Sequence, residues 1–535
     1  MSGGRSRTLW RRSLAGFVPL LAGAALLAAP AAAPARDAPL RFDSRQSLQQ
    51  QFGYAPAYMV NLPSFDAENR AYIRSRTTSQ NATKYVFSLR NGAFRRASIL
   101  DAVRRAYPSF RATVNAGGWG SDAVEADALG RLYTLLEISL DDGSLSNVLL
   151  YSVNAGRSWR LVSLPFKPPR RSPDGLINAT TAAEHLVGWN LRSEPPLIAL
   201  WRPVSDWPGE RACRMALYVV QPRFEGDQLV LPAPVFVSDR CLGVIQVAGD
   251  ASFAATVGSI TYIVWAEVAP PGAPGAPTFV AAYDQTTGTL GAPLQVAKAR
   301  PPNDDHTTPG IVADSQGILH VLTGSHNTQF MYTHTIDPTD ATRWTNPEPV
   351  LSSGYVKPGL RPEGRGCQTY LSLVCTPDDA LVIAFRQRRR GVDAGFGGES
   401  YDALSVQRLA PGGAWSDARR VVYCSNNVGY AQYYHKLTID RRGRLYLSLS
   451  YFRPCDWPAN KRAANRYHHR MLLISEDGGT SWRFARLADF VNGAVAPAAT
   501  DAVAPASAPA TDTAAPPPAS AAATGTVTPP ADAEQ

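Results

Sequence analysis

The sequence predicts an all-β fold, and three observations support this expectation. Short apolar runs interrupted by Gly, Pro, Asn and Asp recur along the chain, while helical periodicity is scarce. A hairpin pattern, D-x-x-G-x-L followed by a strand, is repeated. Its copies are "DALGRLYTLLEI" from Asp127, "DSQGILHVLTG" from Asp314, "DRRGRLYLSLS" from Asp440 and a degenerate "TPDDALVIAFR" from Thr376. We expect the Asp and Gly of each copy in the hairpin turn.

The third observation is a short motif that ends in tryptophan. "SEDGGTSW" at 475–482 fits the Asp-box pattern S-x-D-x-G-x-[ST]-W in full, and "SVNAGRSW" at 152–159 fits it with Asn154 in place of Asp. The acid or amide can accept hydrogen bonds from loop N–H groups, and Gly supplies an unusual dihedral angle. The Trp can fill the space between neighbouring sheets.

These boxes resemble those of sialidase-like β-propellers, the BNR-repeat proteins. The resemblance implies four-stranded units arranged radially, which also accounts for the length of the chain. Seven blades over residues 36–490 would average about 65 residues each. The sequence therefore predicts an all-β, seven-bladed β-propeller, with six blades as the alternative, and closure by joining early and late strands.

The two ends of the chain are expected to lie outside this fold. Residues 1–35 combine arginines, an Ala/Leu-rich apolar run and a small-residue cleavage site, as in an export signal, and "RRSL" partly resembles a twin-arginine signal. Residues 491–535 are mostly Ala, Pro, Thr and Ser, as in a disordered tail. We expect residues 36–490 to fold, in a secreted or periplasmic protein without a membrane span in its mature chain.

Charge and cysteine content narrow the class of ligand and compartment. The net charge of +9 is unchanged when the four arginines of the export signal and the four acids of the tail are removed. A moderately basic exported domain would attract an anionic ligand. The even number of cysteines in an oxidising compartment predicts disulfides. They are Cys213, Cys241, Cys367, Cys375, Cys424 and Cys455.

The candidate site comes from residues placed symmetrically about two hairpin turns. His306 lies about ten residues before the turn near Ser315, and His326 lies about ten after it, so antiparallel pairing brings both to one open end. Tyr370 and Arg386 lie eight residues before and after Asp378 in the next hairpin. In a propeller, equivalent ends of adjacent hairpins converge on one face. His320, within a strand, is expected to be structural.

The second half of the chain carries a more specific resemblance. "HTTPGIVADSQGILHVLTGSHN", "TYLSLVCTPDDALVIAFRQRRRGVDAGFGG", "HKLTIDRRGRLYLSLSYFR" and "YHHRMLLISEDGGTSW" are similar to BNR-type propellers that include ulvan lyases and related rhamnosyl-glucuronate lyases. The similarity covers about residues 300 to 485. It implies that His306, His326, Tyr370 and Arg386 are catalytic.

These residue types suit β-elimination at a uronic acid. The reaction needs a cation at the C6 carboxylate, a base for the C5 proton and an acid for the leaving oxygen. Arg386 can bind both carboxylate oxygens, and a nearby guanidinium would favour the phenolate form of Tyr370 for proton transfer. His306 and His326 would supply the second proton-transfer group or help to bind the carboxylate. No cofactor is required, while a metal ion, structural or held by the histidines, remains an alternative.

Further residues are expected to bind substrate on the same face. They are Arg388, Tyr430, His435 and Arg453. The predicted function is therefore an exported, monomeric lyase acting on an anionic polysaccharide, with no nucleic-acid partner.

Three alternatives remain open. A sialidase is disfavoured because the leading R-I-P motif is missing. A glycosidase resembling α-L-rhamnosidases and a non-catalytic glycan-binding propeller are the others. Two departures from the lyase pattern keep the glycan-binding propeller open: Leu371 and Ser372 follow Tyr370 where many lyases have proline, and the hairpin lacks its usual Gly.

Overall fold

The computed structural model describes twelve stretches of the chain, all of them in the first of its two units, residues 1–494. They are residues 39–42, 62–74, 85–114, 123–165, 179–188, 191–204, 214–244, 251–350, 368–389, 401–424, 432–451 and 469–491. The predicted signal segment 1–35 and the predicted tail beyond residue 491 lie outside them. Within these stretches, no helix is both long enough and apolar enough to cross a membrane.

The fold is mostly β, as predicted, and its strands form successive antiparallel sheets. The first sheet contains β2 (Pro63–Phe65), β3 (Ala71–Arg74), β4 (Tyr85–Arg90) and β5 (Ala93–Ser98). The second contains β6 (Phe110–Val114), β7 (Glu125–Ala126), β8 (Leu132–Leu140), β9 (Leu145–Ser152) and β10 (Arg160–Ser163). Helix α2 (Leu100–Ala106) lies between them in sequence.

A nine-stranded sheet follows and contains two antiparallel groups, joined where β16 pairs with β18. The first group is β11 (Ala179–Thr181), β12 (Ile198–Pro203), β13 (Met215–Val220) and β16 (Val235–Gly243). The second is β17 (Ala254–Val257), β18 (Ile260–Glu267), β19 (Ala276–Asp284), β20 (Thr289–Leu290) and β21 (Leu294–Ala299). A separate hairpin is formed by β14 (Arg223–Glu225) and β15 (Gln228–Val230).

Three sheets come from the C-terminal half. One contains β22 (Gly310–Ala313), β23 (Leu319–Leu322), β25 (Met331–Asp337), β26 (Asp340–Trp344) and β27 (Glu348–Pro349). The next contains β24 (His326–Thr328), β28 (Gln368–Cys375), β29 (Leu381–Arg389), β30 (Tyr401–Leu409) and β31 (Arg419–Cys424). The last contains β32 (Gln432–Ile439), β33 (Leu445–Tyr451), β34 (His469–Ser475) and β35 (Arg483–Phe484) and precedes α5 (Leu487–Val491).

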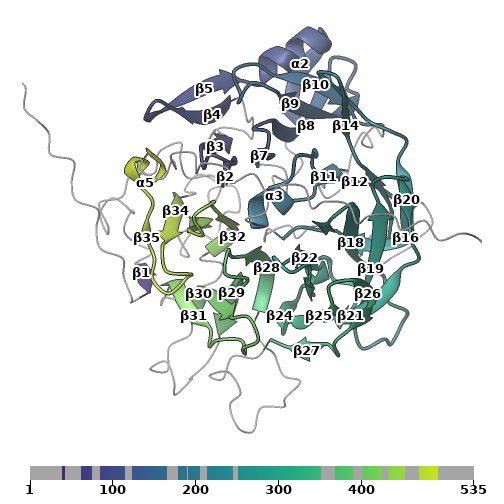
Figure 1. Ribbon diagram of the computed structural model, residues 1–535, viewed down its shortest axis with the longest axis vertical. Helices are drawn as coiled ribbons and strands as arrows, with labels where there is room; N and C mark the ends of the chain where they lie inside the picture. The colour runs from purple at the N-terminus through teal and green to yellow at the C-terminus, as the bar shows by residue number, and fades with distance from the viewer. Residues whose placement is uncertain are drawn as a thin grey trace, which may run out of the picture. The chain divides into compact units, whose positions relative to one another are not determined.

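Contacts between strands link several of these sheets that follow one another in the sequence, and they link the last sheet to the first. β2 contacts β7, β17 contacts β22, β22 contacts β28, and β28 contacts β32, which in turn contacts β2. The short helix α3 (Glu184–Val187) contacts β2, β7, β17, β28 and β32, and Figure 1 shows the sheets following one another around it. The early strand β1 (Leu40–Phe42) also pairs, in parallel, with the late strand β31.

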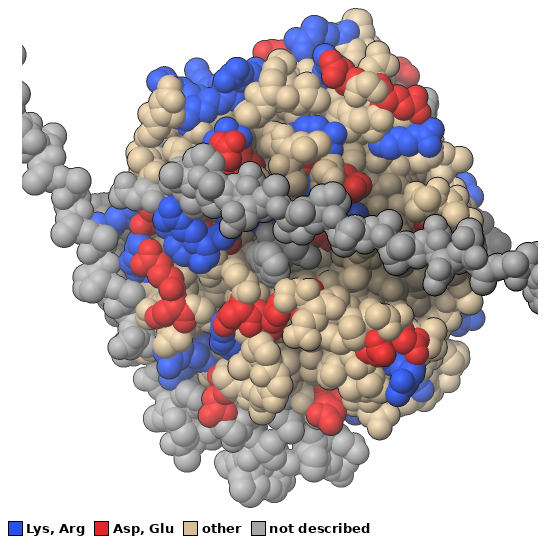
Figure 2. Space-filling model, viewed as in Figure 1, with Lys and Arg blue, Asp and Glu red and all other residues tan. Residues whose placement is uncertain are grey.

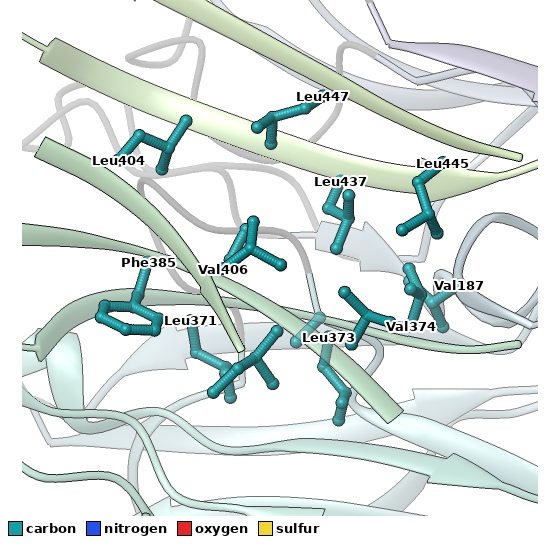
Figure 3. Packing of buried hydrophobic residues seen from close by; sticks show 14 of the residues in the cluster. Val187, Leu371, Leu373, Val374, Phe385, Leu404, Val406, Leu437, Leu445 and Leu447 are labelled. Atoms are coloured by element: carbon teal, nitrogen blue, oxygen red, sulfur yellow. The ribbon is translucent and has the colours of Figure 1, made fainter. Parts of the chain in front are cut away.

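Hydrophobic clusters fill the spaces between neighbouring sheets. Phe65 and Ile73 of the first sheet share a cluster with Tyr446 and Leu472 of the last. The largest cluster joins β28, β29 and β30 to β32 and β33, and Figure 3 shows its leucine, valine and phenylalanine side chains interleaved. Strand β28 is buried along its whole length. Burial on both faces of a sheet explains why the strand carries apolar residues on both faces.

The Asp of the repeated hairpin lies in the turn, as predicted, and Asp127 and Asp440 are buried there. Asp440 accepts hydrogen bonds from the backbone N–H groups of Arg442 and Arg444 and from Nε of Arg444, at 2.6 to 2.9 Å. The Tyr446 hydroxyl lies 3.5 Å from the same carboxylate. Asp127 has the same partners at equivalent positions, and Asp66 forms a further copy that the sequence comparison missed. In the degenerate copy, Thr376 Oγ1 accepts from the N–H of Ala380.

Both Asp boxes have the expected internal hydrogen bonds. Asp477 accepts from the Ser481 backbone N–H at 2.8 Å, and Asn154 accepts from the Ser158 backbone N–H at 2.9 Å. Trp482 is buried in the largest hydrophobic cluster. Trp159 is buried in the cluster that joins the first two sheets. Each tryptophan therefore helps to fill the space between neighbouring sheets.

The expectation of disulfides is wrong for two of the cysteines. Cys241 and Cys375 are free, buried thiols. Each lies on a strand packed inside a hydrophobic cluster, where a small apolar side chain fits without a covalent partner. Cys213, Cys367 and Cys455 lie outside the described residues, and the side chain of Cys424 is not described.

Some of the positively charged residues of the chain lie together at one edge of this unit. Arg95 and Arg96 on β5 and Arg104 and Arg105 on α2 are exposed. Figure 2 shows lysine and arginine side chains gathered over β4, β5 and α2, at the top of that view. Part of the positive charge therefore lies outside the candidate site.

We predict that Asp440→Ala lowers the free energy of unfolding by about 3 kcal/mol, because it leaves buried N–H groups and the Arg444 guanidinium without their acceptor. Urea unfolding measures this change. Asp337→Ala is the matched control, since Asp337 accepts hydrogen bonds only in an exposed turn, and its cost should stay within about 1 kcal/mol. Equal costs for the two variants would show that the buried turn Asp is not a stability determinant.

Candidate functional site

His306 and His326 lie side by side at the open end of the β22–β23 hairpin. His306 is in the 3₁₀ turn η2 (Asp305–Thr307) before β22, and His326 begins β24 after β23. Their ring centroids are 4.3 Å apart. The sequence placed both at one end of this hairpin, and the structure brings them into contact. Their side chains are 19% and 31% exposed, so both rings can be reached from solvent.

Asp304 joins the two histidines and was missed by the sequence reasoning. One carboxylate oxygen lies 2.5 Å from Nδ1 of His306, and the other lies 2.8 Å from Nδ1 of His326. Burial alone would raise the pKa of Asp304, but hydrogen bonds from His306 and His326 outweigh burial and hold that pKa well below its usual value. The local signal was the spacing Asp-x-His, in which Asp304 caps the turn by accepting the N–H of His306.

Tyr370 extends this cluster from the neighbouring sheet. Its ring centroid lies 5.1 Å from that of His306. Thr369 pairs with Arg386 and Ser372 with Ala384, so two residues of β28 oppose one residue of β29, and Tyr370 has φ of 67°. A bulge with a left-handed non-glycine residue costs energy and persists where surrounding contacts enforce it, often at functional sites. The neighbouring Leu371 is buried in the core.

Arg386 completes the group. Its guanidinium carbon lies 4.2 Å from the centre of the Tyr370 ring. Tyr370 and Arg386 are each only 2% exposed, in contrast to the histidines. The four residues expected at the site therefore form one continuous group, His326–His306–Tyr370–Arg386, with the histidines at its more exposed end.

His435 differs from the substrate-binding position that the sequence suggested. It is buried on β32, with Nε2 3.0 Å from the carbonyl oxygen of Ala384 and a further hydrogen bond to the backbone of Tyr370. Burial lowers the pKa of His435 to about 3, so the ring stays neutral. A neutral imidazole held by backbone groups of β28 and β29 supports the bulge instead of contacting solvent.

The side chains of the other three predicted binding residues, Arg388, Tyr430 and Arg453, are not described by the structure. Arg388 lies on β29 opposite Asp402, but its side chain is not described. Tyr430 and Arg453 lie outside the described residues. Their proposed contacts with substrate remain predictions.

His320 has the structural role that the sequence suggested. It occupies the position taken by Tyr72, Tyr133 and Tyr446 in other copies of the hairpin, six residues after the turn Asp. Its Nε2 lies 3.4 Å from Asp314, and its Nδ1 lies 2.8 Å from the Tyr332 hydroxyl.

Among the described residues, Asp304, His306 and His326 form the group able to hold a metal ion, with one ligand atom of each lying within 4.8 Å of the others. The two Nδ1 atoms, however, already lie at hydrogen-bond distances from the carboxylate. A metal ion bound through either Nδ1 atom would have to replace the hydrogen bond that this atom makes with Asp304.

Comparisons with known proteins agree with the repeats. Residues 277–509 match the model of the BNR repeat-containing family, which confirms the resemblance inferred from the Asp boxes. No curated protein matches the sequence.

Similar solved structures include two lyases and a sialidase. The polysaccharide lyase Uly1 has 12% identity over 43% of this chain and 53% of its own, with a TM-score of 0.29. The ulvan lyase PL25 bound to GlcA(1-4)Rha3S has 11% identity over 43% of this chain and 69% of its own, with a TM-score of 0.24. Trypanosoma rangeli sialidase with the inhibitor DANA has 14% identity over 73% of this chain and 57% of its own, with a TM-score of 0.35. The chain thus spans about half the length of the first of these.

We predict that His435 makes the fold sensitive to acid. The pKa of His435 is 6.5 in the unfolded chain and about 3 in the folded chain. Between pH 3 and pH 6.5, His435 is therefore protonated in the unfolded chain and neutral in the folded one. Stability is therefore full above pH 6.5 and falls as the pH drops toward 3. In His435→Gln, the loss of unfolding free energy between pH 7 and pH 4, measured in urea, should be smaller by on the order of 2 kcal/mol. An unchanged pH dependence would contradict this assignment.

Proposed function

We propose that this chain, whose residues 277–509 match the BNR repeat-containing family, is an exported lyase that cleaves a uronate-containing anionic polysaccharide by β-elimination. The observation that carries the proposal is the continuous group of His326, His306, Tyr370 and Arg386. It combines a cation with three groups that can transfer protons. These side chains can supply the base, the acid and the cation that the reaction requires.

We further infer that the sheets form seven blades of a propeller. The two groups of the nine-stranded sheet, together with the five other large sheets, give seven groups of four to six strands within the described part of the chain. Contacts link β2 to β7, β17 to β22, β22 to β28 and β28 to β32, and β32 in turn contacts β2. Hydrophobic clusters lie between neighbouring groups. In such a ring, the open ends of hairpins β22–β23 and β28–β29 lie on one face.

The chemical step divides between these residues. A base removes the C5 proton of the uronate, the C–H electrons form the C4–C5 double bond, and the C4–O4 bond breaks as an acid protonates O4. Arg386 neutralises the C6 carboxylate, where negative charge develops. Its guanidinium over the Tyr370 ring also stabilises negative charge on the phenol, which suits Tyr370 to proton transfer at C5 or O4. The histidines bind the carboxylate or carry the second proton.

We predict that incubation with ulvan, or with a glucuronate-rich plant gum, produces the ultraviolet absorbance of an unsaturated uronate. Tyr370→Phe should reduce the rate by about 10²–10⁴-fold, because it removes a proton-transfer group while keeping the ring. Tyr446→Phe is the matched control, since Tyr446 is also buried but lies at a hairpin turn beside Asp440. It should cleave at the wild-type rate.

Other outcomes distinguish the alternatives. Release of reducing sugar without the absorbance would identify a glycosidase. Binding of the polysaccharide without cleavage would identify a glycan-binding propeller. Full activity of Tyr370→Phe would remove Tyr370 from the mechanism.

A further inference from the structure

We propose that Asp304 is the positioning residue of this site, and that it holds both His306 and His326 with a proton on Nδ1. Proton transfer by either ring then passes through Nε2. The inference about the rings rests on the geometry alone, while its consequence for catalysis rests on the proposed lyase function, with the histidines carrying a proton and not binding the substrate carboxylate. Nothing in the family match assigns a role to this carboxylate.

The carboxylate is itself fixed by its surroundings. Besides the two imidazoles, Oδ1 accepts the backbone N–H of His306 at 2.9 Å, and the Asp304 carbonyl accepts the Thr307 hydroxyl at 2.5 Å. The preceding Asn303, with φ of 55°, uses both ends of its side-chain amide to bind the backbone of Ala269, at 2.7 and 3.1 Å. Asp304 is therefore held on both sides and can act as a rigid support for the rings.

The ionisation of Asp304 decides which imidazole nitrogen carries the proton. Hydrogen bonds from both histidines keep the pKa of Asp304 well below its usual value, so the carboxylate is ionised and can only accept. Each Nδ1 atom facing it must therefore donate. In a neutral imidazole with Nδ1–H, the lone pair lies on Nε2. A single carboxylate thus selects the same tautomer for both rings.

The other Asp–His contact in this hairpin shows the difference between a positioning and a structural carboxylate. At the turn end, His320 uses Nε2 toward Asp314 and Nδ1 toward the Tyr332 hydroxyl, so both nitrogens serve the fold. At the open end, the carboxylate contacts only Nδ1 of each ring, and the rings are partly exposed. Asp314 at the turn end can therefore serve as a control for Asp304 at the open end of the same hairpin.

An asparagine cannot replace Asp304. Its side chain has one acceptor oxygen and one donor NH₂ group, so it can accept from one Nδ1–H but faces the other ring with a donor. Asp304→Asn should leave one imidazole in the wrong tautomer or orientation. Asp304→Ala should release both rings.

We predict that both variants lower kcat by about 10²–10⁴-fold, as expected when the orienting carboxylate of a histidine is lost, with KM changed by less than about threefold. Asp314→Asn is the matched control, because it alters an Asp–His contact of the same hairpin away from the site, and its kcat should stay at the wild-type value. Circular dichroism and Tm establish that each variant is folded. Wild-type kcat in Asp304→Ala, or a change in KM alone, would overturn the positioning role.

A second measurement is independent of any activity. In protein labelled with ¹⁵N-histidine, with signals assigned through His306→Gln and His326→Gln, long-range ¹H–¹⁵N spectra should show protonated Nδ1 and unprotonated Nε2 for both rings. Asp304→Asn should convert at least one ring to the Nε2–H form. Wild-type rings in the Nε2–H form would overturn the inference, whether or not a polysaccharide is cleaved.

The same spectra test the metal alternative. Zn²⁺ added to chelator-treated protein should leave the Nδ1–H signals of both rings in place. Stoichiometric Zn²⁺ binding that removes both signals, and that Asp304→Ala abolishes, would make Asp304 a metal ligand and overturn its role as a hydrogen-bonding support. If the spectra are as expected and no polysaccharide is cut, the lyase proposal fails while the tautomer assignment stands.

Discussion

Packing of each sheet between two neighbours is the constraint on which the rest of the structure depends. Hydrophobic clusters lie on both sides of the central strands, and β28 is buried along its whole length. Polar side chains within such strands would lose their hydration without compensation. The candidate catalytic residues accordingly lie at or near strand ends. His306 precedes β22, His326 follows β23, and Tyr370 and Arg386 lie near the open end of β28 and β29.

The two ends of each hairpin meet different physical demands. At the turn, a buried acid must satisfy backbone N–H groups that no strand can pair, and Asp127 and Asp440 do this with the same set of partners. At the open end, no such demand exists, so side chains are available for other roles. At the turn end, His320 contacts the turn residue Asp314, in the position that a tyrosine occupies in other copies of the hairpin. At the open end, His306 and His326 contact each other.

The position of Tyr370 shows how the fold supports the site. Its left-handed backbone is unfavourable for a tyrosine, and the contacts around the bulge compensate for that cost. Leu371 is buried in the core next to the bulge, and His435 makes a hydrogen bond with the backbone of Tyr370. Buried residues around the bulge therefore determine where the phenol lies relative to Arg386 and His306.

The sequence by itself determined the features that depend on local chemistry. The all-β class, the Asp boxes and the hairpin turns follow from residue types at fixed spacing, and symmetry about a turn brought His306 and His326 to one end. The tertiary structure decided the rest. The bulge at Tyr370 depends on strand register, the burial of His435 depends on packing between sheets, and the contact of Asp304 with His326 joins segments from the two sides of a hairpin. Such contacts arise only when the strands pair and pack, so no local pattern encodes them.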